Sequence, residues 1–161
     1  DQLAEIGLGL GADVPVFVRG HAAFGEGVGE KLTPATPPED WFVVLKSECN
    51  ISTGKIFSAE GLTRDTPKIK IRPAFEGDAS RYRNDCEDVV RKLYPEVNQS
   101  LEWLSQFGPA RLTGTGACIF GRFPTESAAR IIWESKPSGI TGFVAKGVNH
   151  SPLHKKLTEL K

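Results

Sequence analysis

The residues from Thr113 to Ala117 form a glycine-rich loop that could bind an anion. They read Thr-Gly-Thr-Gly-Ala and lie between two apolar runs. Several backbone N–H groups of such a loop could point at a phosphate. The loop has no lysine of its own, however, and no obvious helix follows it. Glycine hairpins that only join two buried strands have the same pattern, so the loop alone leaves both interpretations open.

A second glycine-rich stretch, GLGLGADVPVF, carries a single carboxylate at Asp13. The pattern places this residue between the end of a helix and an apolar run that we interpret as a strand. The ordinary role of an isolated aspartate at such a junction is a hydrogen bond that caps a helix or closes a turn. The residue types alone therefore do not make Asp13 catalytic.

Composition restricts the classes of function. A chain of 161 residues that is 39% hydrophobic can form one globular domain or a large piece of a two-lobed protein. Its 20 Lys and Arg balance 20 Asp and Glu, which disfavours nucleic acid or an anionic membrane as a partner. No apolar stretch approaches the roughly 20 residues that a membrane span needs. We expect a soluble, cytoplasmic protein.

Cysteine and histidine do not indicate a metal site. The three cysteines are widely spaced, which predicts reduced thiols and no disulfide framework. His150 and His154 are four residues apart, but Ser151 and Pro152 between them indicate the start of a helix. The two imidazoles are therefore not expected to stack on one helical face, and we assign no metal ligand.

Hydrophobic periodicity, glycine turns and capping residues predict the secondary structure. Strands are expected at residues 15–19, 21–24, 29–32, 41–46, 111–113, 118–123 and 141–148. Helices are expected at residues 1–8, 53–57, 84–94, 95–107, 125–135 and 151–161, and residues 61–77 should be irregular. Ser52 or Thr53 would cap the helix through Phe57, and Thr125 would cap the helix through about Ser135. Asn84 with Glu87 resembles a capping box.

This order of elements predicts an α+β fold, with helices on one face of a mainly antiparallel sheet. The strand–helix–strand unit from Arg111 to Val148 fits half of a ferredoxin-like split βαβ.

Five stretches together resemble one enzyme family. They are GLGLGADVPVF, HAAFGEGVGEKLTP, the pair Asn84-Asp85 followed by Glu87, RLTGTGACIFG, and FVAKGVNHSPLH. They occur in the order found in 4-diphosphocytidyl-2-C-methyl-D-erythritol kinases, members of the galactokinase, homoserine kinase, mevalonate kinase and phosphomevalonate kinase superfamily. The resemblance covers essentially the whole chain. It implies a ferredoxin-like C-terminal kinase lobe and a step in non-mevalonate isoprenoid precursor synthesis.

The resemblance also implies roles for particular residues. Asp13 would be the catalytic carboxylate. The cytidine of the substrate would lie beside Thr53 and Phe57. Backbone groups of Gly114, Thr115, Gly116 and Ala117 would support the phosphate site. The implied reaction transfers the γ-phosphoryl group of ATP, with Mg²⁺, to the 2-hydroxyl of 4-diphosphocytidyl-2-C-methyl-D-erythritol. The sequence leaves open whether the protein forms a homodimer.

The family's lysine and its main phosphate-binding loop have no counterpart in these 161 residues. The resemblance therefore implies that residues 1–32 are the end of the N-terminal lobe and residues 33–161 the C-terminal substrate-binding domain. Asp1 is expected to be an interior cut, and the isolated chain should be inactive. A non-catalytic ferredoxin-like module that binds a small ligand is the alternative, because a fold does not dictate a function.

Overall fold

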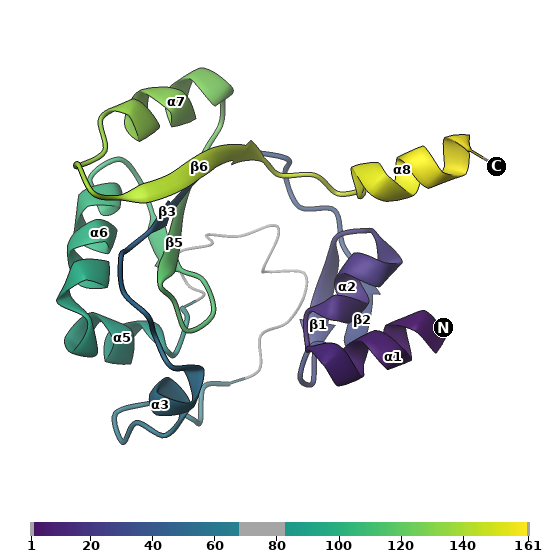
Figure 1. Cartoon of the computed structure of the whole chain (residues 1–161), viewed down its shortest axis with the longest axis horizontal. Helices are drawn as coiled ribbons and strands as arrows, with labels where there is room; N and C mark the ends of the chain where they lie inside the picture. The colour runs from purple at the N-terminus through teal and green to yellow at the C-terminus, as the bar shows by residue number, and fades with distance from the viewer. Residues whose placement is uncertain (1, 68–82, 161) are drawn as a thin grey trace. The chain divides into compact units, whose positions relative to one another are not determined.

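A computed structural model describes residues 2–67 and 83–160 of the chain (Figure 1). Two compact units make up the fold. The first contains residues 1–39 and 147–161, and the second contains residues 40–146. The predicted boundary at residues 32 and 33 differs from this division. The assignment of the chain to kinase lobes stays a prediction.

The second unit is built on a four-stranded antiparallel sheet. Its strands are β3 (Trp41–Lys46), β4 (Ala110–Leu112), β5 (Cys118–Phe123) and β6 (Thr141–Lys146), in the order β4-β5-β3-β6. Because β5 and β6 are both antiparallel to β3 and lie on either side of it, they run parallel to each other. The helix between them, α7 (Glu126–Glu134), completes a split βαβ unit, as the sequence predicted.

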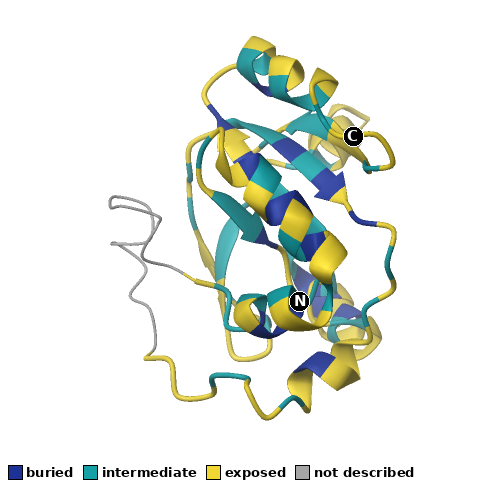
Figure 2. Ribbon diagram, turned by 90° about the vertical axis from the view of Figure 1, so that its left-hand side faces the viewer, coloured by how far each residue is buried: buried dark blue, intermediate teal, exposed yellow. Residues whose placement is uncertain are grey.

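Successive side chains of a strand point to opposite faces of the sheet, so the positions of the apolar residues decide which face is buried. Val43 and Leu45 of β3 point to the same face as Ile119 and Phe123 of β5, and all four are buried. Buried positions, in dark blue, occur along both strands and helices of the ribbon in Figure 2. The buried face of the sheet packs on α7 and on α6 (Pro95–Ser105). The predicted α+β fold, with helices on one face of an antiparallel sheet, is therefore confirmed.

Short helices complete the second unit. Ser52 caps α3 (Thr53–Phe57), since its hydroxyl accepts a hydrogen bond from the Lys55 N–H. Thr125 caps α7 in the same way through the Ala128 N–H. Both caps were predicted from the sequence. Helix α5 (Glu87–Leu93) precedes α6, and its buried residues belong to the same core.

The first unit joins the two ends of the described chain. It contains α1 (Gln2–Leu10), α2 (Val14–Arg19), the hairpin of β1 (Ala23–Glu26) and β2 (Lys31–Pro34), and α8 (Pro152–Glu159). A bridge between His21 and His150 connects its N-terminal and C-terminal segments. The Asn149 side chain also donates a hydrogen bond to the Pro37 carbonyl at 3.0 Å.

The prediction of a strand at residues 15–19 is wrong, because these residues form helix α2. The run Val-Pro-Val-Phe-Val is rich in β-branched residues, which favours a strand by local propensity. Pro15 nevertheless occupies the first turn of the helix, where its missing N–H costs nothing, and Gly20 ends the helix in the left-handed conformation at φ 68°. The two predicted strands that follow are each shifted by two residues in the structure.

Candidate functional site

The glycine loop, residues 113–117, joins β4 to β5. The Thr113 N–H donates to the Cys118 carbonyl at 3.0 Å, and the Gly116 N–H donates to the Thr113 carbonyl at 2.9 Å. Gly114 has φ 54° and Gly116 has φ 86°, a region that favours glycine. Both glycines are therefore needed for the backbone path of the turn.

The two glycines differ in their surroundings. A Cβ atom added at Gly116 would lie 2.9 Å from Ile51 Cδ1 and 3.1 Å from Leu112 Cδ1. A Cβ atom added at Gly114 would meet no heavy atom within 4 Å. The loop is thus packed on the core at Gly116 and open at Gly114.

The open part of the loop presents backbone donors. Among residues 2–67 and 83–160, no acceptor receives a hydrogen bond from the N–H of Gly114 or of Thr115. Two neighbouring amides of this kind, in a turn with left-handed residues, can bind an anion. This arrangement is compatible with the phosphate-supporting role that the family resemblance implies.

The structure brings one predicted substrate-binding residue to this loop. The Thr53 Oγ1 atom of α3 lies 3.1 Å from the Thr115 Oγ1 atom, within hydrogen-bond distance. Phe57 is at the other end of α3, and its side chain is 54% exposed. An exposed aromatic ring and a hydroxyl on one short helix could hold a nucleobase by stacking and hydrogen bonding.

Asn84 and Glu87 hold the same loop, which the sequence did not predict. The Asn84 Nδ2 group donates to the carbonyls of Leu112 at 3.1 Å and Gly114 at 2.6 Å. A Glu87 carboxylate oxygen, Oε2, accepts from the Leu112 N–H at 3.1 Å. The predicted capping box is formed only in part: Asn84 Oδ1 accepts the Cys86 N–H at 3.0 Å, but the Glu87 carboxylate bonds the Leu112 N–H in place of the reciprocal bond to Asn84. The residue at the N-cap position is Cys86, and Glu87 is the first helical residue.

Asp13 belongs to the first unit. It occupies the N-cap position of α2, yet its carboxylate makes no capping hydrogen bond, and the residue is exposed. The ordinary capping role that the sequence suggested is thus not the one that this side chain has in the structure. Its catalytic role stays a prediction.

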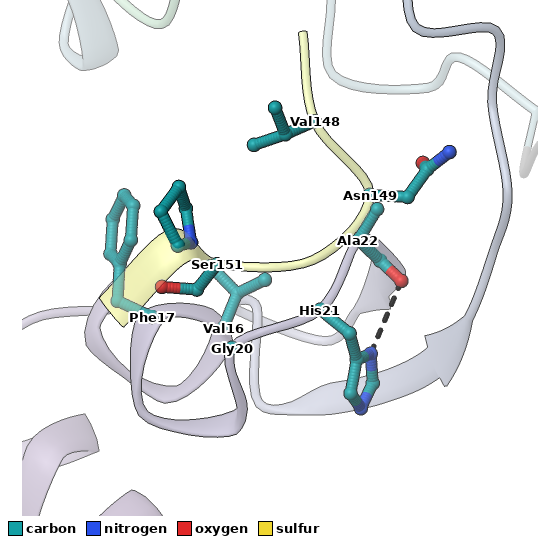
Figure 3. A pocket seen from close by; sticks show the side chains of 9 residues that line it. Val16, Phe17, Gly20, His21, Ala22, Val148, Asn149 and Ser151 are labelled. Carbon is teal, nitrogen blue, oxygen red and sulfur yellow. Dashed lines mark hydrogen bonds between the residues drawn. The ribbon is translucent and has the colours of Figure 1, made fainter. Parts of the chain in front are cut away.

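An open pocket of about 280 Å³ lies in the first unit (Figure 3). Its lining is mostly apolar, with Val16 and Phe17 from α2 and Val148 from the segment that leads to α8. The His21 ring lies at its edge, where Nδ1 is 3.2 Å from the Ala22 carbonyl oxygen. Asp13 does not line this pocket, so the hollow and the predicted catalytic residue are separate features.

The three thiols are unpaired, as expected. Burial, and to a lesser extent the charge of Glu96, raises the pKa of the Cys49 thiol. Burial and the charge of Asp85 likewise raise the pKa of the Cys86 thiol. Nowhere in residues 2–67 and 83–160 do three His, Cys, Asp or Glu side chains come together as metal ligands would. Across the same residues, no helix has the length and apolar character required to cross a membrane.

Comparisons with known proteins show which proteins the chain is similar to. Residues 70–135 match the family described as GHMP kinases C terminal. These residues are similar to the C-terminal domain of that kinase family. Over all 161 residues, the chain is 98% identical to the 4-diphosphocytidyl-2-C-methyl-D-erythritol kinase of Marinobacter nauticus and covers 56% of that relative. It is 54% identical to the enzyme of the same name from Hahella chejuensis, of which it covers 53%.

A solved structure agrees with these matches. The crystal structure of a 4-(cytidine 5'-diphospho)-2C-methyl-D-erythritol kinase matches 90% of this chain with a TM-score of 0.74 and 25% identity. The match covers 56% of that protein. The chain thus spans about half the length of the curated relatives that it matches. The resemblance predicted from the sequence motifs is confirmed.

Proposed function

We propose that this chain serves an ATP-dependent kinase that phosphorylates the 2-hydroxyl of 4-diphosphocytidyl-2-C-methyl-D-erythritol. The observation that carries the proposal is the 98% identity, across all 161 residues, to a protein named as that kinase. The comparisons do not favour the alternative of a non-catalytic binding module. The product would enter non-mevalonate isoprenoid precursor synthesis, and we propose a cytoplasmic location.

Asp13 would act as the general base. The carboxylate would accept the proton of the 2-hydroxyl while that oxygen bonds to the γ-phosphorus of ATP and the bond to the β,γ-bridging oxygen breaks, releasing ADP. The exposed carboxylate of Asp13, which makes no capping hydrogen bond, supports this role.

The glycine loop would form one wall of the phosphate site. The Gly114 and Thr115 amides would donate hydrogen bonds to phosphate oxygens, while Gly116 and Ala117 would carry the chain back into β5. Thr53 and Phe57 would contact the cytidine. The 3.1 Å contact between Thr53 and Thr115 supports a continuous surface for the diphosphocytidyl group.

ATP would be the co-substrate, and Mg²⁺ would neutralise charge on its phosphates. The described residues contain no cluster of three metal-ligating side chains, so no step is assigned to a metal on this chain. We expect no nucleic acid or membrane partner. Sedimentation measurements would test the hypothesis that the protein forms a homodimer.

The test uses the full-length Marinobacter nauticus relative with substitutions numbered as in this chain. D13N should lower kcat by roughly 10²–10⁴-fold and leave both KM values nearly unchanged, because general-base catalysis acts on the transition state. D40N is the matched control, since Asp40 pairs with Arg122 on the surface at 2.9 Å. Wild-type turnover in D13N would refute the assigned base.

The alternative function has its own test. Calorimetric titration of the chain with 4-diphosphocytidyl-2-C-methyl-D-erythritol, CDP and a panel of amino acids should show preference for the cytidine compounds. Preference for an amino acid would favour a ligand-sensing module. The isolated chain should produce little or no ADP, because the family's main phosphate-binding loop does not occur in its sequence.

A further inference from the structure

We propose that Asn84 is a positioning residue that, with Glu87, orients the Thr115 N–H toward the phosphate groups of the nucleotide. This inference rests on the proposed kinase function. Asn84 lies before α5 and contacts the loop across 28 and 30 positions of sequence, through the carbonyls of Leu112 and Gly114. These are tertiary contacts, not local turn contacts.

The Asn84 side chain makes hydrogen bonds through both N–H groups and its oxygen. Its amide group has two N–H donors, one for each of the two carbonyls. Its Oδ1 atom accepts the Cys86 N–H at 3.0 Å, which ties the side chain to the backbone that begins α5. With both ends held, the amide plane has one orientation, and it imposes that orientation on the carbonyls that it binds.

Planarity of the peptide unit transmits this orientation to the anion-facing side. In a trans peptide, the carbonyl of one residue and the N–H of the next point in opposite directions. The Gly114 carbonyl points at Asn84, so the Thr115 N–H in the same peptide unit points away from Asn84. Among the described residues this N–H has no acceptor. Asn84 thus fixes a donor that it does not touch.

Glu87 holds the strand from which the loop starts. Leu112 is the last residue of β4, an edge strand of the sheet. Its N–H donates to the Glu87 carboxylate, while its carbonyl accepts from Asn84. The two side chains therefore replace the neighbouring strand that an edge strand lacks. The other Glu87 oxygen, Oε1, lies 3.8 Å from the Arg91 guanidinium, which anchors the carboxylate.

N84D in the full-length Marinobacter nauticus relative tests the proposal. The carboxylate has the shape of the amide but cannot donate to either carbonyl, while it can still accept from Cys86. We expect kcat/KM for ATP to fall at least tenfold. In ¹H–¹⁵N spectra, a non-hydrolysable ATP analogue should shift the Thr115 amide signal of the wild type and leave that of N84D unshifted.

N149D is the matched control, because the Asn149 side chain also donates to a backbone carbonyl, that of Pro37 in the first unit. Its kcat/KM should stay within twofold of wild type. N84S provides a second variant, with a side chain too short to bridge both carbonyls, and should show the same loss if N84D does not fold. A merely structural role would lower the melting temperature without changing the kcat/KM of the folded enzyme or the Thr115 response.

Two results would overturn the inference in distinguishable ways. If D13N lowers kcat as expected while N84D behaves as wild type, the kinase assignment stands and Asn84 has no positioning role. If the nucleotide analogue does not shift the Thr115 amide in the wild type, the loop does not face the phosphates. That result would overturn both the role of Asn84 and the proposed phosphate wall.

Discussion

Replacing Gly116 by alanine should destabilise the second unit much more than the same replacement at Gly114. Both residues have a positive φ, at 86° and 54°, so both variants carry the cost of a left-handed non-glycine residue. That cost is about 1–2 kcal/mol. At Gly116 the added methyl group would also meet Ile51 and Leu112 at 2.9 and 3.1 Å. Overpacking of this kind costs roughly 1–3 kcal/mol.

The difference between the two variants isolates the packing contribution. We expect a free energy of unfolding lowered by about 1–2 kcal/mol in G114A and by roughly 2–5 kcal/mol in G116A, from the sum of the two costs. Urea unfolding followed by tryptophan fluorescence measures this difference. All three tryptophans, Trp41, Trp103 and Trp133, belong to the second unit, so the signal reports that unit alone.

Equal stabilities for G114A and G116A would refute the reasoning. They would mean that Ile51 and Leu112 move aside at no cost, or that the loop does not pack on the core at Gly116. A larger loss for G114A would contradict it more strongly, because no described heavy atom lies within 4 Å of its added methyl group. Equal slopes against urea in both variants would show that the same surface unfolds.

Three further results are expected. F57A should raise the KM for the diphosphocytidyl substrate about tenfold with little change in kcat, since loss of base stacking costs roughly 1–3 kcal/mol; steady-state kinetics of the full-length relative would detect it, and an unchanged KM would argue against stacking. Cys49 and Cys86 should react slowly with Ellman's reagent at pH 7 and rapidly in urea, because burial raises the pKa of both thiols. The hydrogen bonds from the backbone amides of Glu30 and Val28 lower the pKa of the Glu30 carboxyl, so its NMR titration midpoint should lie below the usual glutamate range; the associated stabilisation is present above the unfolded-state pKa and is lost as pH falls through the folded-state pKa.

The sequence predicted the parts of the fold that local chemistry determines. The bounds of β3 and β5 match the predictions, because their apolar residues are flanked by polar or turn residues. Ser52 and Thr125 act as caps because a hydroxyl at the N-cap position needs no tertiary partner. By contrast, the β-branched residues of α2 favoured a strand, and local propensity alone could not reveal the helix.

The candidate site was predictable only where its residues act through local backbone geometry. Gly114 and Gly116 could be identified as turn residues because a positive φ is a local requirement. Asn84 and Glu87 have the spacing of a capping box, so their types and separation agree with a local role and conceal the tertiary one. The decisive fact is that Leu112 ends an edge strand, which leaves one N–H and one carbonyl to be satisfied from outside the sheet. The Asn84 amide satisfies the Leu112 carbonyl, and the Glu87 carboxylate satisfies the Leu112 N–H. The order of the strands, which no local sequence pattern determines, decides where these two side chains are needed.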